Sequence, residues 1–488
     1  MIIFPRRIGT SSTLNARSVS KSIRALAATL PVFFVCFMLI SPAASAQSPS
    51  QPVIEGTVQN LTNSPNASTA PVVAVVGSHV YVAWEEKVPG SKHVTYFQTS
   101  PDNGTDWNAQ IAFSSMPGGA SPQTSAVQIA AEGTYVFLTW EQNNQTAYAI
   151  SSDYGATFKY NLFNVTGSLA GTMSGEAVSA CGTYAYFTWG DIATTGKGPI
   201  IFAQAHDIGA GVFKFTTPKQ ISSTTSSHRE DESACSGNHA YVVWDSIYFT
   251  VSTNNGATWA PVKQLRPAGG SGGSLSREPM ISANGTNVYV TFPSDSTPDG
   301  SYQTFIVVSN NYGASFAPAK DLSYGHLSNA REVQVTSDHS DVYITSRGQS
   351  ANYSGTQQYV YVSNNNGSTF TAPHLVGGTK LPNPENGFGG VAIDKSNGNV
   401  YVQWIHNPPG KSLKGIQQIF LSASQDFGAT WSTTQQLSNS PVNGTLGYGD
   451  PAGGQGPQVA ANLGRVFSVW VDLSTNNGDI NFVASLAS

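Results

Sequence analysis

Hydrophobic and polar residues alternate in eight short segments along the chain, and seven of the eight segments end in Trp or Phe. Successive side chains of a strand point to opposite faces, so this alternation is typical of a strand with one buried face. The segments are residues 80–84, 136–140, 185–189, 240–244, 288–292, 342–346, 400–404 and 466–470. The pattern predicts an all-β protein built from one repeated unit.

A second motif, Ser-x-Asp/Asn-x-Gly-x-x-Trp/Phe, occurs in six good copies and one degraded copy. The glycines of successive copies are 47 to 61 residues apart, a period that suits four-stranded propeller blades. Gly accepts positive φ in a tight hairpin, and the Asp or Asn side chain bonds nearby backbone amides, so the motif is structural. The good copies are residues 100–107, 151–158, 252–259, 309–316, 363–370 and 424–431, and the degraded copy is 205–213.

The two repeats differ in number, and the difference predicts how the ring closes. The eighth unit stops after residues 480–485, one strand short of a full blade. Residues 59–65 nearly repeat residues 435–441, which follow the last copy of the motif. We therefore expect one propeller of eight four-stranded blades, with seven blades as the alternative, in which strand 54–62 lies beside strand 480–486 and completes the last blade.

The motif resembles the Asp-box, or bacterial neuraminidase repeat (BNR), of the sialidase-like propeller superfamily, and the resemblance covers nearly the whole chain after its N-terminus. It implies a β-propeller whose binding or catalytic residues lie on loops at the face opposite the Asp-boxes. Propellers of this superfamily include sialidases, other glycosidases, receptor ectodomains and non-catalytic assembly factors.

Charge and the N-terminus indicate the compartment. Charged residues form only 10% of the chain; without the first 46 residues, 18 basic and 28 acidic groups remain, which gives 18 − 28 = −10. Such a balance disfavours a nucleic-acid partner. Basic residues precede an apolar run at 26–40, and Ala-Ser-Ala ends at Ala46, so 1–46 is predicted to be a secretory signal and 47–488 the propeller domain. The run is short for a membrane span, so a secreted or cell-surface protein with no stable span after cleavage is expected.

Two cysteines remain after the signal. Cys181 and Cys235 occupy equivalent positions in adjacent repeats, which predicts a disulfide in an oxidising compartment; two buried thiols are the alternative. Zinc-type Cys/His spacing and phosphate-binding Gly loops are absent, so no metal and no cofactor are predicted.

Charged residues recur where the chain enters the inner strands. The pairs are Arg229-Glu230, Arg277-Glu278 and Arg331-Glu332, and blade three has Gly175-Glu176 at the corresponding place; Arg347 follows an aromatic strand. One interpretation is a set of salt bridges between inner strands. The other is an anion or polar sugar site, because clustered guanidinium groups bind carboxylates.

The resemblance also implies what a catalytic member would need, namely an arginine cluster for the substrate carboxylate, a Tyr activated by a Glu as nucleophile, and an Asp as acid/base. Arg277-Glu278-Pro279 matches the family's Arg-x-Pro signature, and Tyr448 lies in a late interblade loop, so Tyr448 and Glu278 are the candidate catalytic pair. Two hypotheses follow: a module that binds an extracellular glycan or envelope protein without efficient catalysis, or an exo-α-sialidase or other glycoside hydrolase.

Overall fold

A computed structural model shows how the strands are arranged, and it describes most of the chain after residue 52. The described residues are 53–89, 92–113, 124–163, 172–192, 198–222, 231–266, 278–295, 297, 300–352, 355–376, 389–406, 418–438, 458–473 and 478–486. The predicted secretory signal therefore lies outside the described residues and stays a prediction.

The described residues form eight antiparallel sheets, and seven of these sheets follow one another along the chain. Blade 1 contains β2 (Ala67–Val76), β3 (His79–Val88), β4 (Lys92–Ser100) and β5 (Ile111–Ala112). Blade 2 contains β6 (Thr124–Glu132), β7 (Tyr135–Gln142), β8 (Gln145–Ser151) and β9 (Lys159–Leu162). Blade 3 contains β10 (Thr172–Cys181), β11 (Tyr184–Ile192), β12 (Ile200–Asp207), β13 (Phe213–Phe215) and β14 (Lys219–Gln220). Blade 4 contains β15 (Glu232–Ser236), β16 (His239–Trp244), β17 (Tyr248–Ser252) and β18 (Lys263–Gln264), with a short 3-10 helix, η1 (Asp245–Ile247), between β16 and β17.

The second half of the chain repeats this order. Blade 5 contains β19 (Met280–Asn284), β20 (Asn287–Ser294), β21 (Gln303–Ser309) and β22 (Lys320–Asp321). Blade 6 contains β23 (Leu327–Asp338), β24 (Asp341–Ser350), β25 (Thr356–Ser363) and β26 (His374–Leu375). Blade 7 contains β27 (Gly389–Asp394), β28 (Asn399–His406), β29 (Gln418–Ser424) and β30 (Gln435–Gln436). Blade 8 contains β31 (Gln458–Asn462), β32 (Arg465–Asp472) and β33 (Asp479–Leu486), and its outer strand is β1 (Val53–Asn60).

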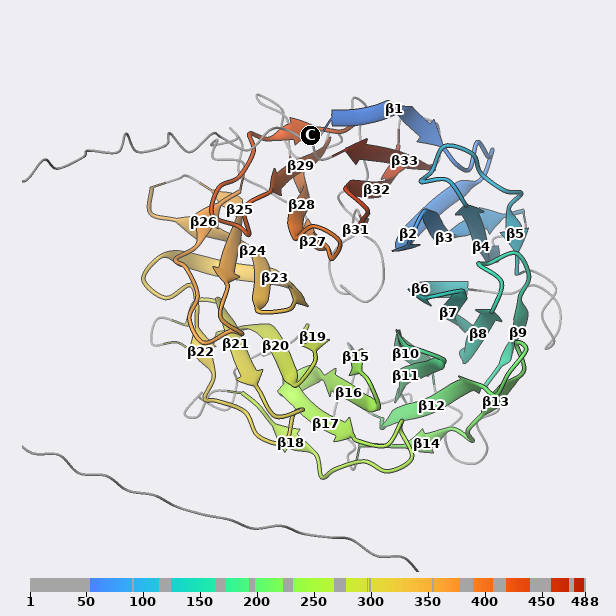
Figure 1. The fold of residues 1–488 in the computed structure, drawn as a ribbon, viewed down its shortest axis with the longest axis horizontal. Coiled ribbons are helices and arrows are strands. Elements are labelled where there is room, and N and C mark those ends of the chain that lie inside the picture. Colours follow the sequence, from blue (N-terminus) through green and yellow to red (C-terminus); the bar gives the residue numbers. More distant parts are fainter. Residues whose placement is uncertain are drawn as a thin grey trace, which may run out of the picture. The chain divides into compact units, whose positions relative to one another are not determined.

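The predicted closure of the ring is confirmed. β1 pairs antiparallel with β33, and the Leu61 amide extends this pairing by donating to the Ile480 carbonyl at 2.8 Å. Each inner strand contacts the inner strands of both neighbouring blades, and β31 contacts β2, so eight blades surround one axis (Figure 1). The seven-bladed alternative is therefore excluded.

Large aromatic side chains fill the space between the blades. The alternation predicted second strands with one buried face, but these strands are buried on both faces because each blade packs between two neighbours. The Trp residues of the alternating segments are fully buried; they are Trp84, Trp140, Trp189, Trp244, Trp404 and Trp470. Blades pack face to face through these strands, so one face of each sheet contacts the preceding blade and the other face the following blade.

In blades 1 to 7 an Asp-box follows the third strand and leads to the outer strand, and each good copy has the same hydrogen bonds. The box Ser hydroxyl donates to the Asp or Asn side chain and accepts from the Gly amide at 2.8–2.9 Å. The same Asp or Asn oxygen accepts an amide four residues later at 2.8–2.9 Å. The expected role in forming the hairpin is confirmed.

The box also binds one blade to another. Its Gly has φ of 76–84° in the six good copies, and a Cβ at that position would lie 3.0 Å or less from a side chain of the preceding blade, such as Phe202 at Gly256 or Phe249 at Gly313. The box aromatic packs against the same side chain, and the ring centroids of Trp259 and Phe202 are 4.8 Å apart. The glycine is needed both for its backbone angle and for this close contact.

A further set of hydrogen bonds between blades is not marked by any sequence motif. The Lys263 ammonium, on the outer strand of blade 4, donates to the carbonyl of Gly313 in the box of blade 5 at 2.9 Å, and Lys219 contacts Gly256 in the same way at 2.6 Å. In blade 8 the Gln59 amide, on β1, takes this role toward Gly104 at 2.7 Å. The N-terminal strand thus reproduces the interblade contact of an ordinary outer strand.

Blade 3 departs from the four-stranded pattern. Its degraded box is followed by two short strands, β13 and β14, which both pair with β12. Nothing lies within 4 Å of a Cβ built at Gly209, and Gly211 makes the interblade contact instead: a Cβ there would lie 2.5 Å from Ser152 of blade 2, and its carbonyl accepts from Lys159 at 2.7 Å. The predicted disulfide between Cys181 and Cys235 is present and joins blades 3 and 4.

None of the described helices has the length and apolar character needed to cross a bilayer.

Candidate functional site

Loops that enter the inner strands lie next to those that leave the second strands, because the two strands are antiparallel. We call this side of the ring the mouth face and the opposite side, which carries the boxes, the Asp-box face. Several inner strands begin at the mouth face with an irregular residue of positive φ: Ala70, Gly175, Glu278 and Glu332 have φ of 52°, 70°, 53° and 53°. Bulges of this kind redirect a side chain.

Blade 6 is more irregular than its neighbours. Arg331 lies between two positive-φ residues, Asn329 at 51° and Glu332 at 53°, and the register of β23 against β24 shifts on both sides of Arg331. A non-glycine residue in this region costs on the order of 1–3 kcal/mol. Two such residues within four positions mark Arg331 as a place where the fold tolerates strain.

A row of polar side chains crosses blade 6 at this level. Arg331 of β23 is the cross-strand partner of Arg347 on β24, and Arg347 is the partner of Gln358 on β25. Like charges directly opposite one another destabilise a sheet, so two facing arginines need compensation. Gln358 is buried, and neither atom of its amide group has a hydrogen-bond partner in the described structure.

Arg347 is compensated by Glu332. Its guanidinium lies 2.6 Å from Glu332 Oε1, and the two side chains are only 22% and 11% exposed. Burial raises the pKa of Glu332 to about 7, Arg347 and Arg331 oppose this increase, and the nearby Glu278 adds to it. Burial is the larger effect, because removing a carboxylate from water disfavours its charged form. Glu332 is therefore poised to gain or lose a proton near neutral pH.

Arg331 is held by an aromatic ring of the neighbouring blade. Its guanidinium lies 3.8 Å from the ring centroid of Tyr302, which precedes β21 of blade 5. The Ala330 amide donates to the Tyr302 carbonyl at 2.8 Å and fixes the two segments relative to each other. Stacking leaves the in-plane N–H groups of an arginine available. In the described part of the chain, Arg331 has neither a hydrogen bond nor an ion pair, and its Nε is shielded from solvent.

The structure brings together three of the predicted site residues. Arg331, Arg347 and Glu278 all act on the Glu332 carboxyl, so they lie in one cluster at the mouth face of blades 5 and 6. Arg229, Arg277 and Tyr448 lie outside the described residues, so the three-arginine cluster and the Tyr448–Glu278 pair stay predictions. The predicted salt-bridge role is present too, although the described pair, Arg347–Glu332, joins two strands of one blade rather than two inner strands.

One register assignment from the sequence is wrong. Gly175-Glu176 does not correspond to the Arg-Glu pairs. Ala177 pairs with Thr188 as Gln334 pairs with Thr345, so Glu176 is equivalent to Val333, one position after Glu332. Glu176 instead corresponds to Asp231 in blade 4, where Glu232 pairs with Val243, and both acids are buried. The spacing to the second strand shows the same offset, because Glu332 lies 13 residues before Thr345 whereas Glu176 lies 12 residues before Thr188.

Sequence reasoning missed two members of the cluster. Tyr302 has no motif, and it meets Arg331 only because blades 5 and 6 are adjacent. Gln358 is the second of two consecutive glutamines in a third strand, which was a weak signal that a polar side chain faces inward. No group of three or more His, Cys, Asp or Glu side chains suited to a metal ion occurs among the described residues.

Chemically, the cluster offers a stacked guanidinium for an anion and a carboxyl group that exchanges a proton near pH 7. The first property suits recognition of a carboxylate. The second is what a general acid or base requires, but catalysis also needs a nucleophile or an activated water on the other side of the bond.

Comparison with known proteins agrees with the repeat analysis. Residues 234–461 match the family model of the BNR repeat-like domain. No curated protein matches the sequence. Solved structures with a similar arrangement include the phage phi92 endosialidase, at 11% identity and a TM-score of 0.43 over 89% of this chain and 70% of that one. The Hadza microbial sialidase Hz136 is 12% identical with a TM-score of 0.38 over 86% of this chain and 66% of that one. Trypanosoma rangeli sialidase is 12% identical with a TM-score of 0.38 over 90% of this chain and 60% of that one.

The chain thus spans 60% to 70% of the length of these three structures. At TM-scores below 0.5 they indicate neither an activity nor a substrate for this chain. The family match, the six good Asp-boxes and the closed ring of blades agree with one another. The described residues form an eight-bladed β-propeller, of which residues 234–461 match the BNR repeat-like domain.

Proposed function

We propose that this protein is a secreted or cell-surface binding module that recognises a carboxylate-bearing sugar at the mouth face of blades 5 and 6, without efficient hydrolysis. The observation that carries the proposal is the Arg331 guanidinium, stacked 3.8 Å from the Tyr302 ring between two residues of positive φ. Strain at one arginine whose stacked side chain leaves its N–H donors available is typical of a prepared binding site.

The neighbouring groups suit the same ligand. When ionised, Glu332 at 2.6 Å neutralises Arg347, which reduces the repulsion between the two facing cations and keeps Arg331 for a ligand. Gln358, across the sheet from Arg347, is 2% exposed, so the ligand contacts proposed here are those of Arg331.

Binding of the methyl α-glycoside of N-acetylneuraminic acid, measured by saturation-transfer NMR and calorimetry, tests the proposal. Arg331→Gln is expected to weaken binding by about tenfold or more, because a charge-assisted hydrogen bond contributes about 1.5–3 kcal/mol. Arg266→Gln is the matched control, since Arg266 is an exposed arginine on the blade 4 outer segment. Equal affinities of the unmodified protein and Arg331→Gln, or no binding, would contradict the proposal.

Hydrolysis is the second candidate function, and the pKa of Glu332, about 7, is the observation that favours it. A glycosidase acid needs a pKa near the working pH. A fluorogenic α-sialoside distinguishes the two functions: the binding module turns it over slowly or not at all. Rapid release that disappears in Glu332→Gln and in Tyr448→Phe would establish a sialidase instead.

A further inference from the structure

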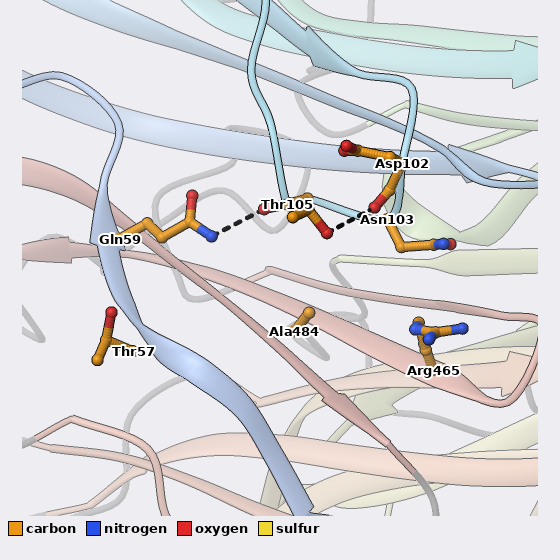
Figure 2. Close-up of a pocket in the computed structure, with 8 residues that line it drawn as sticks. Thr57, Gln59, Asp102, Asn103, Thr105, Arg465 and Ala484 are labelled. Carbon is orange, nitrogen blue, oxygen red and sulfur yellow. Dashed lines mark hydrogen bonds between the residues drawn. The ribbon is translucent and has the colours of Figure 1, made fainter.

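A second polar site lies on the Asp-box face, where the ring closes between blades 8 and 1. A cavity of about 450 Å³ is lined by residues of β1, the first Asp-box, β32 and β33 (Figure 2). The lining residues are Thr57, Gln59, Asp102, Asn103, Gly104, Thr105, Arg465 and Ala484. Small-molecule sites commonly have volumes of about 300–1,000 Å³.

The cavity results from the way in which β1 joins blade 8. Glu55 pairs with Ala484 and Gln59 with Phe482, so residues 56–58 of β1 stand opposite Val483 alone. The extra residues make β1 bulge away from β33, as an unpaired insertion in a ladder does. The described outer strands of blades 1, 2 and 4–7 pair without such a shift.

Equivalent positions at other seams are filled. The first residue of the second strand in one blade contacts the residue that precedes the Gly in the Asp-box of the next blade. His79 stacks on Tyr154 at 4.2 Å, and His239 stacks on Tyr312 at 4.2 Å. Asn287 donates to Asn366 at 3.1 Å. At the seam between blades 8 and 1 the corresponding residues are Arg465 and Asn103, and both line the open cavity.

The cavity contains both hydrogen-bond donors and acceptors. Asn103 Oδ1 is shielded from solvent and accepts no hydrogen bond in the described structure, which is costly without a ligand or water. Burial works against ionisation of Asp102, but hydrogen bonds from the Asp106 amide and the Ser100 hydroxyl lower its pKa. The Asp102 carboxylate accepts hydrogen bonds, rotation of the Asn103 side chain would bring its amide oxygen into the cavity, and the Arg465 guanidinium adds a cation to the lining.

We infer that this cavity binds one or two units of a neutral sugar. Sugar hydroxyl groups donate and accept, and so match a mixed set of lining groups. Six of the eight lining residues are polar, which disfavours an apolar ligand, and the carboxylate of Asp102 disfavours an anion. The inference is independent of the mouth face, because no residue is shared between the two sites.

Saturation-transfer NMR on the full chain, with methyl glycosides of glucose, galactose, mannose and N-acetylglucosamine as probes, tests this inference. At least one probe is expected to bind. Asn103→Gly removes the acceptor but keeps the turn, because glycine readily adopts the φ of 61° found at Asn103. Thr57→Tyr fills the cavity from an exposed position on the bulge. Each change is expected to weaken binding by about tenfold or more.

Asn255→Gly is the matched control, since Asn255 occupies the same Asp-box position in blade 4 with φ of 53° and does not line this cavity. It is expected to leave sugar binding unchanged, as is Arg331→Gln at the mouth face. No binding of any probe up to about 50 mM would overturn the inference. Binding that persists in both cavity variants, or that is lost in Arg331→Gln, would place the sugar elsewhere and overturn it too.

Discussion

Glu332 illustrates how one residue depends on its surroundings for its chemistry. Its sequence neighbours predicted a salt bridge, and the structure adds that the carboxyl is only 11% exposed and strained at φ of 53°. Burial outweighs the attraction of Arg347 and Arg331, so the pKa increases to about 7 from the usual 4.5. The protonated form is thereby favoured in the folded protein relative to the unfolded chain.

This difference predicts a pH dependence of stability. Between pH 4.5 and about 7 the folded protein binds more protons at Glu332 than the unfolded chain does, so the free energy of unfolding decreases as the pH rises. A tenfold change in acidity corresponds to about 1.4 kcal/mol, so the contribution is about 3 kcal/mol. In Glu332→Gln this decrease is expected to disappear, as measured by urea unfolding at pH 5 and pH 8.

The exposed Glu132, changed to Gln, controls for the loss of one negative charge and is expected to leave the pH profile as it is. An unchanged profile in Glu332→Gln would mean that the Arg347 ion pair, rather than burial, governs this carboxyl.

The Asp-box is the element that makes both the hairpins and the ring. Within a blade, its Ser and Asp or Asn side chains hold the turn. Between blades, its Gly and aromatic residue pack on the third strand of the preceding blade. The sequence predicted the first role from local chemistry. The identity of the side chain against each Gly follows only from the order of the blades.

Two glycines of blade 4 separate the roles of backbone angle and close contact. Gly256 has φ of 79° with Phe202 against it, whereas Gly237 has φ of 57° and open space around it. Gly237→Ala is expected to cost about 1–2 kcal/mol of unfolding free energy, from the backbone alone. Gly256→Ala is expected to cost about 1–3 kcal/mol more, from overpacking. Equal losses in thermal or urea unfolding would show that the interblade contact contributes little.

The whole molecule depends on a closure between its two ends. Leu61, next to β1, packs into a buried cluster with Ile480 and Phe482 of β33 and with Trp84 of blade 1. The Thr62 hydroxyl donates to Asp479 at 2.8 Å. These contacts join the N-terminal strand to the last blade and the last blade to the first. Without them β33 and the first blade each present an unpaired surface.

Deletion of residues 53–62 is therefore expected to abolish cooperative unfolding and to cause aggregation, measured by circular dichroism and light scattering. A graded test uses Leu61→Ala, which is expected to cost about 2–5 kcal/mol because it leaves a cavity in the buried cluster. Val58→Ala, at a position 38% exposed, is the control and is expected to change stability by less than about 0.5 kcal/mol. A deletion variant that unfolds like the full chain would contradict the role of the closure.

Repetition explains why so much of the fold was predictable from the chain alone. Alternating strands, turn glycines and their spacing are local features, and each recurs often enough for the strand order, eight blades, the closing strand and the Cys181–Cys235 bridge to follow. The mouth cluster was only partly predictable. Arg331, Arg347 and Glu278 were recognised by residue type, but their neighbours Tyr302 and Gln358 come from other strands. The cavity at the seam and the interblade lysine contacts arise from the packing of one blade on another. Such contacts join residues far apart in the chain, and their distances depend on register and blade geometry, which local patterns do not encode.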